Sequence, residues 1–175
     1  GLVPRWSADA AAVEAMRSVF AHAPMAGRIV IGEGERDEAP MLFIGEEVGH
    51  AAPGSAAVDI AVDPLEGTTL CAENRPGALC VAALAPRGGL LHAPDVYMQK
   101  IAVGPGLRLE DTDLDRPVEA VLRGLARQVE GALRVVMLDR PRHEAAKRAA
   151  LAAGADLTLI PEGDVMGALQ TALPD

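Results

Sequence analysis

The chain has 175 residues, which is enough for one ordinary domain or for part of a larger protein. Half of the residues are hydrophobic but only 2% are aromatic, so the core must be built from aliphatic side chains, as is typical of α/β layers. The formal net charge of −9 excludes nucleic acid as a partner, because binding to a phosphate backbone requires a basic surface.

The expected location follows from what the chain lacks. No stretch reaches the ~18 consecutive apolar residues of a membrane helix, and the N-terminus has no basic-then-apolar leader. The spacing of Cys71 and Cys80 fits neither a zinc-ligand pair nor a redox C-x-x-C motif, so we expect buried, reduced thiols. The sequence therefore predicts a cytoplasmic protein without a membrane partner.

The first predicted element is an amphipathic helix over residues 8–23. Val13, Met16 and Phe20 recur at helical spacing and would share the buried face. Asp9 stands at the predicted start of this helix, where an aspartate commonly caps the free backbone N–H groups. A capping role is therefore one interpretation of Asp9.

Two apolar strands then end in acidic turns. Residues 28–32 lead into Gly-Glu-Gly-Glu-Arg-Asp-Glu, and residues 58–62 lead into Asp-Pro-Leu-Glu-Gly-Thr-Thr. Pro64 fixes its own φ and Gly67 permits close approach of the backbone to a ligand. If the two strand ends lie side by side, the acidic pocket would repel a phosphorylated substrate unless metal ions filled it first.

Asp63 and Glu66 allow two interpretations. Two carboxylates three residues apart, next to exposed N–H groups and hydroxyls, suit a divalent cation that holds a phosphate. Alternatively, Asp63 caps a helix and Glu66 is a solvated acid of its first turn, where the helix dipole favours negative charge.

The second half of the chain predicts a parallel βαβ arrangement. Residues 78–85 are predicted as a buried strand that turns into a short partner over 90–92, and residues 104–116 as an exposed connection. Helix and strand then alternate, with helices over 117–129, 142–153 and 165–173 and strands over 133–138 and 157–160.

Ligands of such a sheet gather at the carboxyl ends of its strands. Arg142 and His143 fall at such an end and at a helix N-terminus, where they could hold a phosphate or simply be solvated.

Three segments carry a resemblance to a known family. In order and spacing, IVIGEGERDEAPMLFIGEEVG, VDIAVDPLEGTT and APDVYMQKIAVGPG resemble the class II fructose-1,6-bisphosphatases. The resemblance implies an α/β fold, the layered α-β-α-β-α sugar-phosphatase fold shared with inositol monophosphatases. Its C-terminal part would be incomplete, because family members continue past the position of Asp175. The expected division is a metal-binding catalytic sub-domain over 1–103, a connection over 104–116 and the first part of an α/β sub-domain over 117–175.

The resemblance also implies a set of site residues. Asp9, Glu33, Asp63 and Glu66 match metal ligands, with Mg²⁺ or Mn²⁺ as the cofactor, and hard oxygen donors suit these ions. Asp37 and Thr68 match a catalytic pair that would orient or deprotonate the attacking water. Arg5 stands where family members carry a lysine. The residues expected to bind the substrate are Glu66, Gly67, Thr68, Tyr97, Arg142, His143, Glu144, Glu162, Gly163 and Asp164. From its residue type alone, Tyr97 could equally be a core tyrosine with a satisfied hydroxyl.

The implied enzyme is a phosphoric monoester hydrolase of gluconeogenesis that removes the 1-phosphate of fructose 1,6-bisphosphate, with sedoheptulose 1,7-bisphosphate as another substrate. A full-length member is expected to form a homo-oligomer, a dimer or a tetramer. One alternative is an enzyme of the inositol-monophosphatase or nucleotide-phosphatase type, which usually has Asp where Glu66 stands. The other alternative is an inactive, truncated member of the family that keeps the motifs without turnover.

Overall fold

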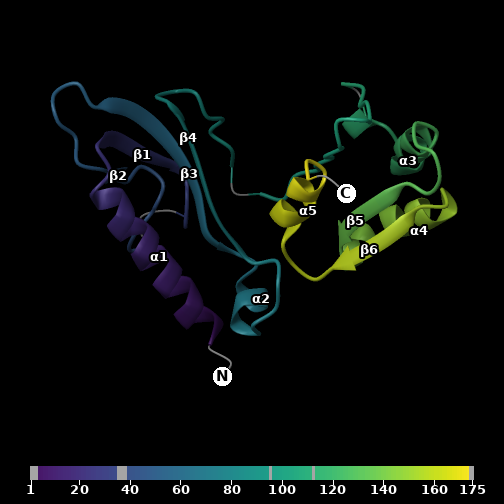
Figure 1. Cartoon of the computed structure of the whole chain (residues 1–175), viewed down its shortest axis with the longest axis horizontal. Helices are drawn as coiled ribbons and strands as arrows, with labels where there is room; N and C mark the ends of the chain where they lie inside the picture. The colour runs from purple at the N-terminus through teal and green to yellow at the C-terminus, as the bar shows by residue number, and fades with distance from the viewer. Residues whose placement is uncertain (1–3, 35–38, 95, 112, 174–175) are drawn as a thin grey trace. The chain divides into compact units, whose positions relative to one another are not determined.

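The computed structural model describes residues 4–34, 39–94, 96–111 and 113–173. The chain divides into two compact units, Gly1–Val96 and Tyr97–Asp175 (Figure 1). Each unit contains both helices and strands, which confirms the α/β class. Residues 104–116, predicted as a connection, lie inside the second unit, and the functional division of the chain stays a prediction.

The first unit is a four-stranded sheet with a long helix. Strand β1 runs parallel to β3, whereas β2 pairs antiparallel with β1 and β4 pairs antiparallel with β3, giving the order β2-β1-β3-β4. In chain order, the elements are α1 (Arg5–Ala21), β1 (Met25–Ile31), β2 (Glu47–Val48), β3 (Ala56–Glu66), α2 (Thr68–Ala72) and β4 (Leu79–Pro86).

Helix α1 is held against the sheet by the predicted apolar face. Val13, Met16 and Phe20 are buried together with Ile29 and Ile60 of the sheet. Burial of each such side chain contributes about 1.5–3 kcal/mol relative to leaving it in water.

The helix begins at Arg5, with Pro4 at the N-cap position, and not near Asp9. The capping interpretation of Asp9 is therefore wrong. Its carboxylate lies one turn inside the helix and is half-buried.

Three expectations about the first unit are wrong. Strand β4 is largely exposed, with Leu84 52% exposed, because β4 is an edge strand of the sheet (Figure 1). Residues 90–92 form no strand. Cys71 and Cys80 are free thiols, as expected, but both are exposed.

The second unit confirms the predicted parallel pair of strands. Strand β5 (Arg134–Leu138) pairs parallel with β6 (Asp156–Ile160), and Leu138 is in register with Ile160. The segments that follow the two strands therefore lie at one edge of the sheet. The helices of this unit are α3 (Val118–Ala126), α4 (Glu144–Ala152) and α5 (Asp164–Gln170), with 3₁₀ turns η1 (Asp113–Asp115) and η2 (Pro141–His143).

A second hydrophobic core fills the space between β5, α3 and α4. It contains Val121, Leu122 and Leu125 of α3, packed with Ala149 and Ala150 of α4. Among the described residues of the chain, no helix is both long enough and apolar enough to cross a membrane.

Candidate active site

Three acidic side chains predicted as metal ligands come together in the first unit. Because β1 and β3 are parallel neighbours, their carboxyl ends meet at one edge of the sheet. Glu33 follows β1 by two residues, Asp63 lies near the end of β3, and Asp9 is on α1, which contacts β3. The acids thus reach one region from three separate segments.

The electrostatics of Glu33 show how near these acids are. Burial raises the pKa of the half-buried Glu33 carboxyl above its ordinary value, and the negative charges of Asp9 and Asp63 raise it further. Among the residues that the structure describes, however, no three His, Cys, Asp or Glu side chains are placed to hold a metal ion as they stand. Both observations hold, because charges repel over longer distances than the ~2–2.6 Å of a metal–oxygen bond.

The residues fit a hard divalent cation by their charge and by their donor atoms. Carboxylate oxygens are the ligands that Mg²⁺ takes, and a cation between Asp9, Glu33 and Asp63 would remove the repulsion that raises the pKa of Glu33. These three residues could therefore hold the ion, together with the predicted fourth ligand Glu66, the last residue of β3.

The backbone around Asp63 excludes the alternative interpretation of Asp63 and Glu66. The Oδ1 atom of Asp63 accepts a hydrogen bond from the backbone N–H of Leu65 at 3.1 Å, within the part of β3 where the pairing register with β4 is irregular. Helix α2 begins only at Thr68, its N-cap is Gly67, and its first turn contains no acidic residue. Asp63 is therefore no helix cap, and Glu66 is no first-turn acid.

Gly67 has a backbone conformation that favours glycine. Its φ is +81°, in the left-handed region, and the Cβ of an alanine here would also approach Leu70 to 3.2 Å. Next to it, the Thr68 hydroxyl donates to the carbonyl of Leu65 at 3.1 Å. Asp37, the predicted catalytic partner of Thr68, lies outside the described residues, so the pair stays a prediction.

Arg5 reaches the same turn from the start of α1. Its Nη1 atom donates to the Thr69 hydroxyl at 2.9 Å. A guanidinium group thus lies beside the segment predicted to receive the phosphate.

The third family segment begins next to the acidic turn that contains Glu33. A small pocket of about 120 Å³ lies between the end of β1 and the start of that segment. The residues that line it are Ile31, Gly32, Gly34, Ile44, Ala93, Pro94 and Val96. The first family segment and the start of the third, distant in sequence, are therefore neighbours within the first unit.

The second unit brings two predicted substrate residues together. The Arg142 guanidinium lies over the Tyr97 ring, 4.4 Å from its centroid. Tyr97 is 88% exposed, so it is not a core tyrosine. His143, in η2, has its Nδ1 atom 2.8 Å from the carbonyl oxygen of Leu138. When Nδ1 donates this bond, the other ring nitrogen is left for a ligand.

Other predicted substrate residues of this unit take part in internal contacts. Glu144 forms an ion pair with Lys147 at 2.7 Å, and Asp164 forms one with Lys100 at 2.9 Å. Gly163 is buried and is the N-cap of α5, with φ +88°, and Glu162 precedes it. No sequence pattern predicted the contacts of Lys100 and Lys147, which hold carboxylates at the predicted substrate edge.

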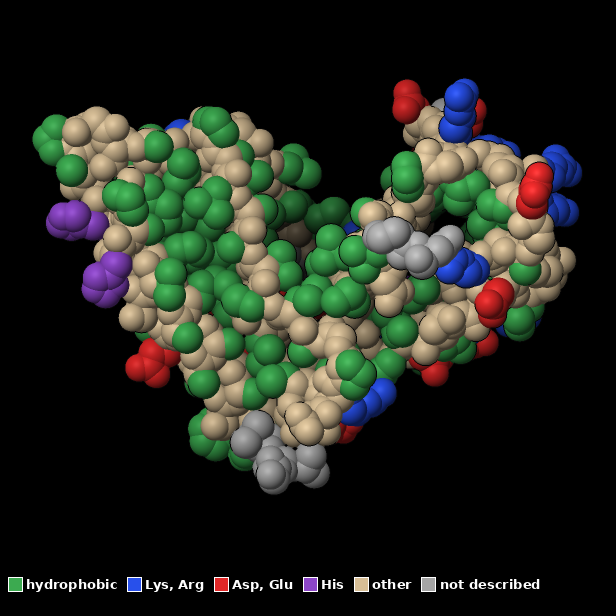
Figure 2. All heavy atoms as spheres, viewed as in Figure 1, with side chains coloured by type: hydrophobic (Ala, Val, Ile, Leu, Met, Phe, Trp, Pro, Cys, Tyr) green, Lys and Arg blue, Asp and Glu red, His purple; other side chains and the backbone are tan. Residues whose placement is uncertain are grey.

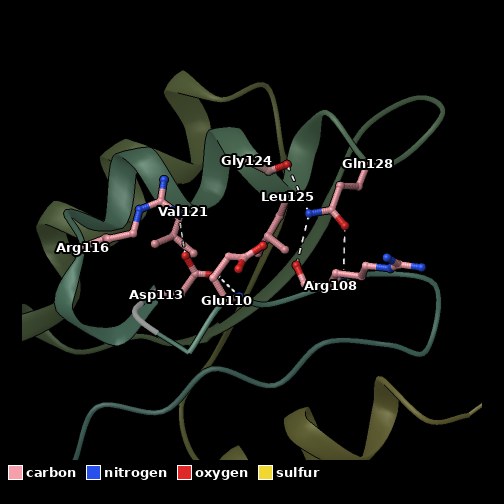
Figure 3. A pocket seen from close by; sticks show the side chains of 8 residues that line it. All are labelled: Arg108, Glu110, Asp113, Arg116, Val121, Gly124, Leu125 and Gln128. Carbon is pink, nitrogen blue, oxygen red and sulfur yellow. Dashed lines mark hydrogen bonds and ion pairs between the residues drawn. The ribbon is translucent and has the colours of Figure 1, made fainter.

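A larger pocket of about 350 Å³ contains none of the predicted residues (Figure 3). Its polar groups bind one another. Asp113 accepts from Arg116 at 2.6 Å and from the N–H of Glu110 at 2.9 Å, and the Gln128 amide bonds both backbone groups of Arg108. These contacts explain the pocket as local structure of the second unit.

Comparisons with known proteins show the family of the chain. The model of the family described as bacterial fructose-1,6-bisphosphatase, glpX-encoded, matches residues 1–175. Similar curated proteins carry the name D-fructose 1,6-bisphosphatase class 2/sedoheptulose 1,7-bisphosphatase. One from Synechococcus sp. (strain JA-3-3Ab) is 47% identical over 93% of this chain and 50% of its own length. Another, from Prochlorococcus marinus (strain MIT 9313), is 47% identical over 97% of this chain and 51% of its own length.

The chain spans about half the length of the curated relatives it matches. The match of the family model covers the whole chain, including all three segments that carry the resemblance. The chain belongs to the bacterial, glpX-encoded fructose-1,6-bisphosphatase family.

Proposed function

We propose that the protein hydrolyses the 1-phosphate of fructose 1,6-bisphosphate with the help of Mg²⁺ or Mn²⁺, and that sedoheptulose 1,7-bisphosphate is a second substrate. The observation that supports the proposal is the convergence of three segments on Glu33, where burial and then the charges of Asp9 and Asp63 raise the pKa of its carboxyl. The names of the relatives support a bisphosphatase over an inositol-monophosphatase type.

The proposed ligands of the cation are Asp9, Glu33, Asp63 and Glu66. When bound, the ion supplies positive charge for the phosphate and lowers the pKa of a bound water. Charge neutralisation is the main requirement, because the protein is acidic and the substrate carries two phosphates.

The chain's own groups have the remaining roles. Thr68, with Asp37, would orient the attacking water and take up its proton, and the backbone from Gly67 to Thr69 would donate N–H groups to the phosphate. The substrate's second phosphate would bind Arg142 and His143, whose side chains lie at the carboxyl edge of β5.

The cellular setting belongs to the same proposal. We infer a cytoplasmic enzyme of gluconeogenesis that assembles as a homo-oligomer. Glu144, Glu162, Gly163 and Asp164 would line the sugar-binding side of the site, where the ion pairs with Lys100 and Lys147 hold two of these carboxylates.

A phosphate-release assay tests the function. Fructose 1,6-bisphosphate, inositol monophosphate and adenosine 3′,5′-bisphosphate are each supplied with Mg²⁺, with Mn²⁺ or with a chelator. We expect release from the fructose substrate only, and only with a metal present. Preferential release from either other substrate would replace the proposed function, and no release above the enzyme-free blank would contradict catalysis by this chain.

A further inference from the structure

Glu46 has contacts that its position in the sequence does not suggest. A glutamate in a run such as Gly-Glu-Glu-Val is ordinarily a solvated charge, but the side chain of Glu46 is only 11% exposed. One carboxylate oxygen forms an ion pair with Arg17 of α1, and the other accepts a hydrogen bond from the backbone N–H of Leu42. Both oxygens are therefore used, and they bind two different segments.

Leu42 connects this carboxylate to Glu33. The carbonyl oxygen of Leu42 accepts the backbone N–H of Glu33 at 3.0 Å. Leu42 is itself completely buried, and its φ of +55° lies in the left-handed region that a leucine rarely adopts. A hydrogen bond from its N–H to a carboxylate helps to hold this conformation, because charged acceptors form stronger hydrogen bonds.

The segment that contains Glu46 is also bonded to β1. The backbone of Ile29 accepts from the N–H of Gly45 at 2.8 Å and donates to the carbonyl of Glu46 at 2.9 Å. The position of Glu46 is thus fixed relative to the strand that leads into Glu33.

Arg17 connects Glu46 to the other side of the acidic site. It lies on α1 eight residues after Asp9, about two helical turns further along the same rigid element. From Asp9 to Glu33 there is therefore a continuous series of contacts, through α1, Arg17, Glu46 and Leu42.

We propose that Glu46 is a positioning residue, which sets the acidic turn of Glu33 at the distance from the Asp9 helix that the metal ion requires. The inference rests on the proposed function, because it presupposes an ion at these acids. Glu46 itself binds no substrate or metal. A carboxylate is required, because the Arg17 guanidinium and the Leu42 N–H are both donors, and each needs an acceptor oxygen.

The test is calorimetric titration of the 175-residue chain with Mn²⁺ in the absence of substrate. Glu46→Ala should weaken Mn²⁺ binding by about 10- to 100-fold, the size seen when outer partners of metal ligands are removed. Glu46→Gln should fall between this variant and the parent, because one amide oxygen can serve only one of the two donors. Glu47→Gln, a change at the exposed neighbouring residue, is the matched control and should bind as the parent does.

Arg17→Met tests the inference without altering the loop, in case Glu46→Ala does not fold. It should weaken Mn²⁺ binding in the same direction, and the double variant Arg17→Met/Glu46→Ala should be no weaker than Glu46→Ala alone. Circular dichroism and thermal unfolding, measured in parallel, show which variants are folded. A purely structural role would lower the unfolding temperature of Glu46→Gln and Arg17→Met and leave their Mn²⁺ affinity unchanged, which would overturn the inference.

Asp63→Asn separates failure of the inference from failure of the proposed function. If Asp63→Asn weakens Mn²⁺ binding while folded Glu46 and Arg17 variants bind as the parent does, the metal site stands and the positioning role is wrong. If Asp63→Asn also binds as the parent does, or if the parent binds no Mn²⁺, the metal site is wrong and both proposals fail.

Discussion

Two carboxylates, Glu33 in the first unit and Asp139 in the second, have opposite environments. In the first unit, burial and the charges of Asp9 and Asp63 raise the pKa of Glu33. In the second unit, a hydrogen bond from Lys147, together with its charge, lowers the pKa of Asp139. Folding alone explains the lowered pKa of Asp139, because its charge has a cationic partner, Lys147, within the chain. The burial of Glu33 near two other carboxylates costs free energy in the absence of a cation, and such a cost is typical of functional sites.

The view in Figure 2 shows a related difference. Hydrophobic side chains are prominent on the visible face of the first unit, whereas charged side chains are more frequent on that of the second. The following variants test whether the acids around Glu33 have the role that the contrast with Asp139 suggests.

The largest effect is expected for Asp63→Asn. Removal of one negative charge from the acidic site should lower metal-dependent phosphate release from fructose 1,6-bisphosphate by at least about 100-fold. The fold should be retained, because the asparagine oxygen can still accept the N–H of Leu65. Phosphate release and circular dichroism measure the two properties, and Glu47→Gln should behave as the parent does. Full activity of a folded Asp63→Asn protein would remove the basis for the metal site.

Gly32→Ala should destabilise the turn that contains Glu33. A Cβ at Gly32 would lie 2.1 Å from the carbonyl oxygen of Leu42, far inside contact distance, so the backbone must shift. We expect a loss of about 1–3 kcal/mol in the free energy of unfolding, as in other overpacked sites, together with weaker Mn²⁺ binding.

The matched control for Gly32→Ala is Gly124→Ala in α3 of the second unit. A Cβ there meets no atom within 4 Å among the residues described, and alanine favours a helix over glycine by about 1 kcal/mol. Urea unfolding should show opposite signs for the two variants, and equal effects would contradict the tight packing around Gly32.

Arg142→Met should affect substrate binding and leave the metal unaffected. Loss of a charged hydrogen bond to phosphate predicts a KM for fructose 1,6-bisphosphate about 10-fold higher. The Mn²⁺ concentration for half-maximal activity should stay unchanged, because a guanidinium group has no donor oxygen to offer the metal ion. Steady-state kinetics measure both quantities, with Arg148→Met, at an exposed arginine of α4, as the control. A change in the metal dependence with an unchanged KM would contradict the role of Arg142 in binding the phosphate.

The smallest effect concerns pH. A carboxyl whose pKa is raised in the folded state stabilises the fold at low pH, and this stability is lost as pH rises from the unfolded value of 4.5 through the folded pKa. Without metal, Glu33→Gln should therefore gain stability relative to the parent as pH rises through that window. Thermal unfolding of both proteins in a chelator gives the difference, and a difference independent of pH would contradict the raised pKa of Glu33.

The end of β1 was predictable because an apolar run that changes into Gly-Glu-Gly-Glu is a strong local signal. The end of β3 was predicted too early, because the strand continues through Asp-Pro-Leu-Glu to Glu66, with an irregular register after Asp63. The parallel pairing of β1 and β3, which brings Glu33 and Asp63 together, depends on contacts between distant residues and was available only as a hypothesis.

Other features left no local signal. The left-handed backbone of Leu42 and the ion pair between Arg17 and Glu46 arise from tertiary packing, so no local pattern distinguishes Glu46 from an ordinary surface acid. The start of α1 was misplaced because Asp9 is a good N-cap residue, whereas the helix follows Pro4. The thiols of Cys71 and Cys80 were expected in the core from the usual burial of cysteine, but both are exposed.

The central claim is that Asp9, Glu33 and Asp63 are gathered for a cation, and the carboxyl of Glu33 reports on it most directly. Its pKa can be measured by ¹³C NMR on glutamate-labelled protein, assigned with Glu33→Gln, in a chelator and in saturating Mg²⁺. We predict a pKa above 4.5 without metal and a large decrease with Mg²⁺. An ordinary pKa that does not respond to Mg²⁺ would contradict the account.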